Sequence, residues 1–246
     1  MKKKLIIAFA VVFAILVIDQ IVKIWVKTTL KDEAISEIEL TSFFKINYVE
    51  NQGMAFGTSF GASVWAKYGL SIFRIIAIIA IVMYMLKQAR AHARTEFLIA
   101  IGLVLAGATG NLIDSMFYDY IFPFDPCDYR NQLVGSGNFT DCALMGKMET
   151  RHSGFLLASV VDMYHFTAEW PSWVPWYDKN SLSGNQIFPA IWNTADAAIS
   201  IGVVMIIIRQ RKYFPKKVVP ANSNTATPTE PIQETPISES NPEENA

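Results

Sequence analysis

Residues 97–117 read FLIAIGLVLAGATGNLIDSMF, an apolar run that ends in a polar Asn–Leu–Ile–Asp element. A helix that crosses a bilayer needs about 20 mostly apolar residues, so this stretch is long enough to span a membrane. It shows no alternation of polar and apolar residues, which argues against a half-buried strand. The run therefore predicts a transmembrane helix that carries Asn111 and Asp114 near one end.

Three further runs have the same character: residues 5–26, 68–86 and 187–208. Together with residues 97–117 they predict an all-α membrane protein with four transmembrane helices. No small-x-small cleavage site follows the first run, so we expect a retained helix and not a removed signal peptide. Of the 246 residues, 52% are hydrophobic and 17% are charged. The net charge of −1 excludes a basic nucleic-acid-binding protein.

Basic residues crowd the N-terminus, the short link between residues 86 and 97, and the segment after residue 208. An excess of lysine and arginine beside helix ends marks the cytoplasmic side of a membrane. Both termini are therefore predicted to be cytoplasmic, and two long loops face outward. The membrane domain is expected over residues 1–217, and residues 218–246, rich in Pro, Thr, Asn and Glu, are expected to form a disordered cytoplasmic tail.

The two outer loops carry recognisable local features. Residues 38–49 alternate in a β-prone pattern, which predicts a short strand or two on the membrane surface. Trp170, Trp173 and Trp176 in the second loop suit the headgroup interface. Both cysteines also lie in this loop, where an oxidising compartment favours a Cys127–Cys142 disulfide, with two free thiols as the alternative.

The ionisable residues within the predicted spans are Asp19, Lys23, Arg74, Asp114 and Asp196, and all fall in the outer half of the membrane. Charges inside a bilayer are costly unless they are paired or functional, so their common depth predicts one outward-opening polar site. Simpler interpretations also exist. Asp19 and Lys23 have the spacing of a structural ion pair, and Arg74 lies near enough to the interface to extend its side chain into it.

Two aspartates share a local pattern, since Asp114 and Asp196 each follow an asparagine, Asn111 and Asn193, by three positions. Neither aspartate has a basic neighbour three or four residues away. A third carboxylate, Asp162, lies in a β-prone run of the second outer loop, although an ordinary loop aspartate is an equal alternative.

The chemistry of this site is expected to rest on carboxylates. No serine, cysteine or phosphate-binding glycine loop has a catalytic spacing, and Asp162 with His165 is too small a set to predict a metal. We therefore expect no cofactor and no metal. Two aspartates a few Å apart cannot both ionise, so they share a proton. One can then act as base on a water while the other protonates a substrate carbonyl.

Five motifs follow one another along the chain: DQxxK from Asp19, residues 47–57, residues 107–114, VVDxxxF from Val160, and FPAIWNTAD from Phe188 with Gly202 after it. This series resembles the lipoprotein signal peptidases (signal peptidase II), which are aspartic proteases of the bacterial plasma (inner) membrane. The resemblance implies four helices with a small outward-facing β cradle. It also implies cleavage of a prolipoprotein signal peptide just before a diacylglyceryl-cysteine, near the outer face of the membrane.

Matched residue by residue, the resemblance assigns the catalytic pair to Asp162 and Asp196. It implies that further residues line the site, position substrate or support the pair: Asn51, Gly53, Asn111, Asp114, Asn193, Asp19 and Lys23. The implied partners are the prolipoprotein, membrane lipid and globomycin-type inhibitors, with no nucleic acid among them.

The chain departs from the family pattern in three places. Ser115 follows Asp114 where the family usually has an arginine, and Arg151 or Arg130 could supply the missing group. An insertion of about residues 118–155 separates Asp114 from the next motif, and Trp192 replaces a phenylalanine.

Two other classes of function compete with a peptidase. A small transporter or channel could use the intramembrane carboxylates as an ion path, but such a path needs polar groups through the full depth of the membrane. A membrane scaffold with structural ion pairs would leave Asp162 and the two Asn–x–x–Asp elements unexplained.

Overall fold

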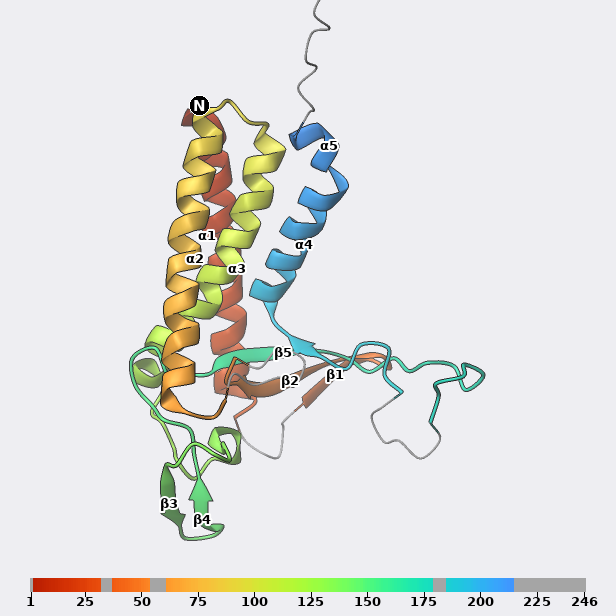
Figure 1. Ribbon diagram of the computed structural model, residues 1–246. Helices are drawn as coiled ribbons and strands as arrows, with labels where there is room; N and C mark the ends of the chain where they lie inside the picture. The colour runs from red at the N-terminus through yellow and green to blue at the C-terminus, as the bar shows by residue number, and fades with distance from the viewer. Residues whose placement is uncertain (1, 32–36, 54–60, 179–184, 215–246) are drawn as a thin grey trace, which may run out of the picture. The chain divides into compact units, whose positions relative to one another are not determined.

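The computed structural model describes residues 2–31, 37–53, 61–178 and 185–214, so the predicted tail at residues 218–246 lies outside the described residues (Figure 1). The helices, in chain order, are α1 (Lys2–Thr29), α2 (Val64–Arg90), α3 (Thr95–Ile121), the 3-10 turn η2 (Tyr129–Asn131), α4 (Thr194–Ile208) and the short α5 (Gln210–Tyr213). The strands are β1 (Glu37–Thr41), β2 (Phe44–Asn51), β3 (Phe139–Cys142), β4 (Gly146–Glu149), β5 (Val160–Phe166) and β6 (Ile191–Trp192).

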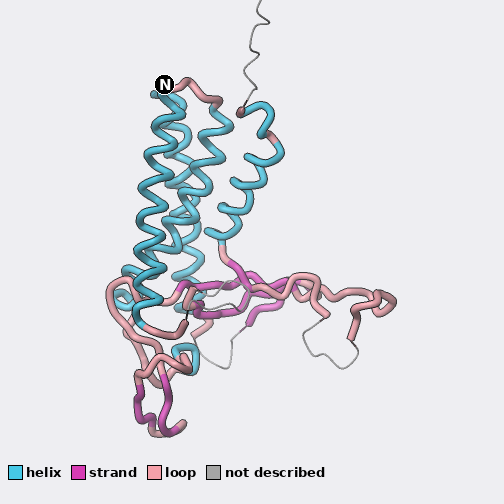
Figure 2. Tube along the Cα trace, in the orientation of Figure 1, coloured by secondary structure: helices cyan, strands magenta, loops and turns pink. Residues whose placement is uncertain are grey.

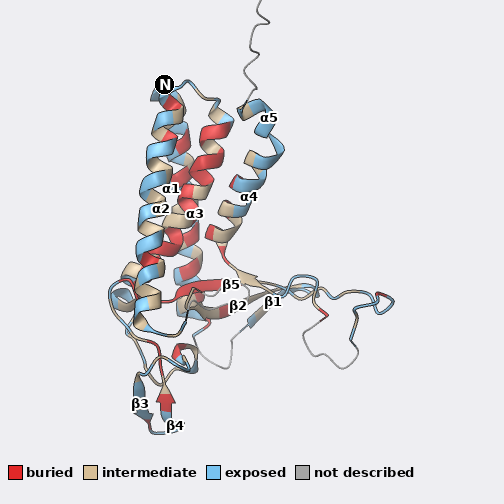
Figure 3. Cartoon of the chain, viewed as in Figure 1, coloured by how far each residue is buried: buried red, intermediate tan, exposed pale blue. Residues whose placement is uncertain are grey.

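Helix α3 forms the centre of the helical bundle and packs against α1, α2 and α4. Buried residues concentrate on α3, whereas much of the surface of α1 and α2 is exposed and apolar, as a lipid-facing surface would be (Figure 3). By length and composition α1, α2 and α3 could each cross a membrane, and α4 is a shorter apolar helix of 15 residues. The chain thus has the helices of a membrane protein.

Helices α3 and α4 come close because glycines lie at their interface. A Cβ added at Gly107 would lie 2.2 Å from the carbonyl oxygen of Ala195, and one added at Gly202 would lie 2.6 Å from that of Ala100. Small residues at such positions allow two helix backbones to approach, as is common between membrane helices. The approach places the first turn of α4 against the middle of α3.

A four-stranded antiparallel sheet in the order β1-β2-β5-β6 lies at one end of the bundle (Figures 1 and 2). Both β-prone stretches of the sequence are strands here, β1 and β2 in the first outer loop and β5 in the second. In the β2–β5 pair Val49 lies opposite Asp162, and Asn51 at the end of β2 lies opposite Val160. The sheet therefore carries Asp162 to the end of the helices.

The insertion has its own small fold, a hairpin of β3 and β4. The Cys127–Cys142 disulfide favoured by the sequence is present and ties β3 to the segment before η2. Helix α3 continues through Ile121, so the first residues of the expected insertion, from about residue 118, are helical.

The expected start of the fourth helix, at residue 187, is wrong. Residues Ile191–Trp192 form β6 and pair with β5, and α4 begins only at Thr194. The reason is local: Asn193 and Asp196 form a capping box, in which each side chain accepts a hydrogen bond from the other's backbone N–H. The apolar residues before Asn193 therefore belong to the sheet end of the bundle.

Candidate active site

Asp162 and Asp196 both line one cavity of about 850 Å³ at the junction of the sheet and the helices. Two asparagines join them. The Nδ2 group of Asn193 donates to Asp162 Oδ1 at 2.6 Å and contacts Asn111 Oδ1 at 3.1 Å, and Asn111 Nδ2 donates to Asp196 Oδ1 at 2.9 Å. This chain of amides fixes the orientation of both carboxylates relative to each other.

Each carboxylate is also held by its own element. Asn51 Nδ2 donates to Asp162 Oδ2 at 2.9 Å from the neighbouring strand. The capping box fixes Asp196, whose backbone N–H donates to Asn193 Oδ1 at 3.0 Å. Burial, and next the negative charge of Asp196, raise the pKa of Asp162 to about 7, against the opposing hydrogen bonds from Asn51 and Asn193. At neutral pH this pair can therefore hold one proton.

A buried ion cluster lies beneath the asparagines. Lys23 Nζ contacts Asp19 at 3.0 Å and Asp114 at 2.8 Å, and all three side chains are at most 1% exposed. The pair expected from the sequence therefore exists, and Asp114 extends it. The same Nζ donates to Asn111 Oδ1 at 2.9 Å, while Asp19 Oδ1 accepts from the backbone N–H of Ala195 at 2.9 Å. None of these three ions is among the described residues that line the cavity, so they act by positioning Asn111 and the start of α4.

Gly53 also lines the cavity, and its position requires a glycine. Its φ is +95°, and an added Cβ would lie 2.2 Å from Leu70 Cδ2. Its N–H donates to Asn51 Oδ1 at 2.8 Å, and the Nδ2 group of the same Asn51 amide donates to Asp162 Oδ2. The turn thus orients the asparagine.

The cavity wall is mostly apolar away from the carboxylates. Its apolar side chains include Phe166, Phe188, Ile191, Trp192 and Ile199. Trp192 packs on Tyr164, with the ring centroids 4.9 Å apart, so the larger aromatic residue is accommodated against the sheet. Two carboxylates beside an apolar wall form a cavity that can hold a ligand with apolar side chains.

The sequence places Arg74 among the charges at the depth of this site and leaves extension to the membrane interface as the alternative. Its side chain lines the cavity, and its Nη1 donates to Ser115 Oγ at 3.3 Å, so the interpretation that it extends to the interface is wrong. A useful signal was available, since Arg74 and Ser115 are polar residues at the same expected depth on different helices.

Arg151 and Arg130 do not supply the missing group. Arg151 binds Asp119 through two hydrogen bonds of 2.9 and 2.7 Å, and its Nε donates to Asn131 at 2.8 Å. Arg130 pairs with Asp128 at 3.3 Å. Neither arginine is among the described cavity-lining residues, because both are used to hold the insertion.

His165 also stands apart from Asp162. The two residues are three positions apart on β5, which directs their side chains to opposite faces of the sheet. His165 contacts Asn47 at 3.3 Å and Gln186 at 3.4 Å. Within the described part of the chain, no three His, Cys, Asp or Glu side chains are grouped as metal ligands.

Comparison with known proteins identifies a matching family and similar relatives. A family model described as signal peptidase (SPase) II matches residues 11–211. The chain is 35% identical over 204 residues to a lipoprotein signal peptidase of Porphyromonas gingivalis, covering 81% of this chain and 80% of that one. It is 29% identical over 238 residues to a lipoprotein signal peptidase of Amoebophilus asiaticus, covering 95% of this chain and 89% of the relative.

A solved bacterial membrane enzyme has the same fold. It is 22% identical in sequence and superposes with a TM-score of 0.51, covering 85% of this chain and 92% of that chain. The family model spans most of the sequence, from α1 to α5, and a relative above 30% identity covers most of it as well. The chain therefore belongs to the signal peptidase II family.

Proposed function

We propose that this protein is an aspartic lipoprotein signal peptidase in which Asp162 and Asp196 together activate a water molecule. The observation that carries the proposal is the chain of amides through Asn193 and Asn111. It holds the two cavity-lining carboxylates in a fixed orientation relative to each other. Membership of a peptidase family supports it, because the family relatives are named lipoprotein signal peptidases.

The proposed reaction uses the single proton of the pair. Asp162 starts protonated, because its pKa is about 7, and donates that proton to the carbonyl oxygen of the scissile peptide. Asp196 takes a proton from water, and the resulting hydroxide adds to the carbonyl carbon. The tetrahedral intermediate collapses when the C–N bond breaks and the nitrogen takes the proton from Asp196. The carboxyl product then returns a proton to Asp162, which restores the pair.

The proposed substrate is a prolipoprotein cut just before its diacylglyceryl-cysteine. The apolar wall with Phe188, Ile191 and Ile199 suits the apolar residues of a signal peptide. The two acyl chains would stay in the bilayer, so the scissile bond would lie near the membrane surface. We place the protein in the bacterial inner membrane with cytoplasmic termini and this site near the outer face, and we expect globomycin-type inhibitors to compete for the cavity.

The transporter and scaffold alternatives have less support. The carboxylates form one closed cluster of hydrogen bonds near the sheet, and do not continue as a path along the helices. Farther along α3 and α4, the contact around Gly202 is made with Ala100, Leu103 and Val104, and the next charged contact among the described residues of these helices is the exposed Glu96–Arg209 pair at their far end.

Cleavage by purified variants tests the proposal. Asp162→Asn and Asp196→Asn should each lower turnover of a diacylglyceryl prolipoprotein by roughly 100-fold or more, because each removes a proton-transfer group. Asp141→Asn, at an exposed position of the hairpin, is the matched control and should cleave like the wild type. Near-normal turnover in either dyad variant would exclude the proposed pair, and an inactive wild type in a lipid bilayer would exclude the function.

A further inference from the structure

A polar stripe lies on one face of α2. Its members, Lys67, Ser71 and Arg74, are four and three residues apart and so share a helix face. Lys67 Nζ donates to the carbonyl oxygen of Gln52 at 3.1 Å, and Ser71 Oγ donates to that of Leu156 at 2.8 Å. These contacts fix this face of α2 against the segments that follow β2 and precede β5.

Arg74, the third member, lines the cavity together with Asp162 and Asp196. Its one side-chain hydrogen bond among the described residues runs from Nη1 to Ser115 Oγ at 3.3 Å. No carboxylate in the described part of the chain comes within 4.0 Å of its guanidinium nitrogens. A guanidinium has five N–H donors, so most of those on Arg74 remain for a group that enters the cavity.

Among the described residues, the surroundings use only one of the donors of this guanidinium. The negative charges of Asp196, Asp114 and Asp162 act on Arg74 from beyond direct contact. A charge held inside a protein is costly unless it is paired or serves a ligand, and a hydroxyl such as that of Ser115 is not a counter-ion. Arg74 therefore has the surroundings of a ligand-binding residue and not those of a member of a structural ion pair.

We infer that Arg74 is a substrate-binding residue that donates hydrogen bonds to backbone carbonyl oxygens of the peptide in the cavity. The inference rests on the proposed function, which brings an extended peptide with carbonyl acceptors to this place. Much of the rest of the wall is apolar, as at Phe188 and Ile199, so few other donors are available to those carbonyls. The planar fork of arginine can bind two acceptors at once, which a lysine cannot reproduce.

Binding can be measured separately from cleavage in the inactive Asp162→Asn/Asp196→Asn double variant. The probe is a fluorescent diacylglyceryl lipopeptide that spans the cleavage site, and its anisotropy in detergent micelles reports the Kd. Adding Arg74→Gln should weaken binding roughly 10- to 100-fold, the effect of losing hydrogen bonds to a charged donor. With Arg74→Lys the Kd should lie between that of the double variant and that of the same variant with Arg74→Gln. Arg90→Gln, at the exposed other end of α2, should leave the Kd unchanged.

The contact with Ser115 allows the positive charge to be moved. Ser115→Arg alone places two guanidinium groups together at a fully buried position and should weaken binding. The double change Arg74→Ser/Ser115→Arg removes the original group, frees its space and returns one guanidinium from α3. This variant should recover most of the affinity that Arg74→Ser loses.

In the active enzyme, Arg74→Gln should raise KM more than it lowers kcat. An unchanged Kd in both Arg74→Gln and Arg74→Lys, or a loss confined to kcat, would overturn the inference. If Arg74→Gln fails to fold, the Kd values of Arg74→Lys and of Arg74→Ser/Ser115→Arg test the inference in its place. Failure of the proposed function would appear differently, as a wild type that binds the lipopeptide through Arg74 and does not cleave it.

Discussion

Asp162 combines burial, two amide donors and an acidic neighbour, and this combination sets a pH dependence. Its pKa of about 7 lies above the ordinary 3.8, so the proton is kept as pH rises to about 7 and is lost above it. If this proton is the one given to the substrate, kcat/KM should fall about tenfold per pH unit on the alkaline side. Initial rates between pH 5.5 and 9 check this, and a flat profile through that range would contradict it.

Asp196 accounts for part of this raised pKa, and its removal can be tested directly. In Asp196→Asn the pKa of Asp162 should fall below about 7 but stay above 3.8, because the neighbouring charge is lost while burial remains. Infrared titration of the protonated carboxyl band reports the value. A pKa that does not move would mean that Asp162 and Asp196 do not interact.

We expect Lys23 to contribute to the stability of the protein as well as to its activity. Lys23→Met leaves Asp19 and Asp114 buried without their common counter-ion, and breaking a buried ion pair in this way costs about 3–5 kcal/mol of unfolding free energy. Thermal unfolding in detergent measures the loss. Lys87→Met, the same change at an exposed site near the end of α2, is the control, and an equal effect of the two would refute the argument.

At this scale the sequence indicated the acids and amides well, because Asn111, Asp114, Asn193 and Asp196 stand out within apolar runs. For Arg74 it indicates only a common depth, and not that the side chain turns into the cavity. A single arginine near the end of a span looks the same whether it reaches the interface or turns inward, and its neighbour Ser115 comes from another helix. Contacts between residues far apart in the chain carry that information.

Among the elements, the α3–α4 contact determines where Asp196 lies. A Cβ at Gly107 would meet the carbonyl oxygen of Ala195, the residue next to Asp196, so Gly107→Ala should push the start of α4 away. We expect a loss of about 1–3 kcal/mol in stability together with a clear loss of activity. Gly69→Ala, which has open space around it on α2, is the control and should be tolerated in both thermal unfolding and cleavage assays. Full activity in Gly107→Ala would show that the contact does not place Asp196.

The insertion is attached to the membrane domain through Arg151. Its guanidinium binds Asp119 at the end of α3 and approaches Glu50 of β2 at 3.8 Å, while its Nε binds Asn131 of η2. Arg151→Met would leave two buried acids without this partner, so the insertion should loosen. Limited proteolysis should then cut within residues 122–155 faster than in the wild type. Arg130→Met tests the specificity, because Arg130 pairs with the nearby Asp128 and should have a weaker effect.

The start of α4 shows why the boundaries of helices and strands are harder to predict from sequence than their presence. Residues 187–192 and the helix that follows are continuously apolar, and hydropathy alone cannot separate a buried strand from a helix. The spacing of Asn193 and Asp196 is visible in the sequence, but spacing alone does not distinguish a capping box from two positions inside a helix. Pairing of β6 with β5 decides the boundary, and that pairing depends on a strand about thirty residues earlier.

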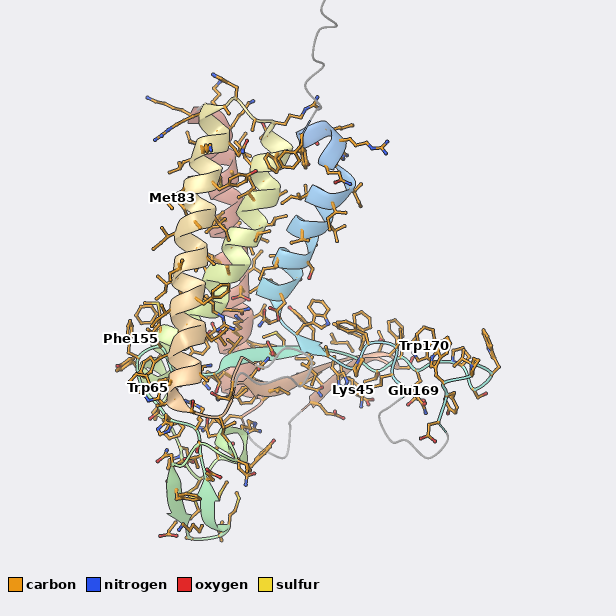
Figure 4. All side chains as sticks on the ribbon, in the orientation of Figure 1. Lys45, Trp65, Met83, Phe155, Glu169 and Trp170 are labelled. Carbon is orange, nitrogen blue, oxygen red and sulfur yellow. A yellow bond between two sulfur atoms is a disulfide. The ribbon has the colours of Figure 1, made fainter. Side chains whose placement is uncertain are left out.

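For the whole molecule, the sheet and the insertion lie at one end of the bundle and the α2–α3 connection lies at the other (Figure 1). Side chains such as Met83 point outward from the helices, whereas Lys45, Glu169 and Trp170 lie along the sheet and its extension (Figure 4). The apolar bundle surface and the polar end layer agree with a membrane protein whose site lies near one surface. From the distribution of lysine and arginine we propose that this surface faces outward.

This orientation makes a last prediction that does not depend on the chemistry of the site. A membrane-impermeant thiol reagent should label Glu39→Cys, whose side chain is 67% exposed on β1, in intact spheroplasts. Arg90→Cys, exposed at the other end of the helices, should be labelled only after the membrane is permeabilised. The parent chain is a suitable background, because both of its cysteines are joined in a disulfide and should not react. The reverse labelling pattern would place the cavity on the cytoplasmic side, where it could not meet a lipoprotein precursor at the outer surface.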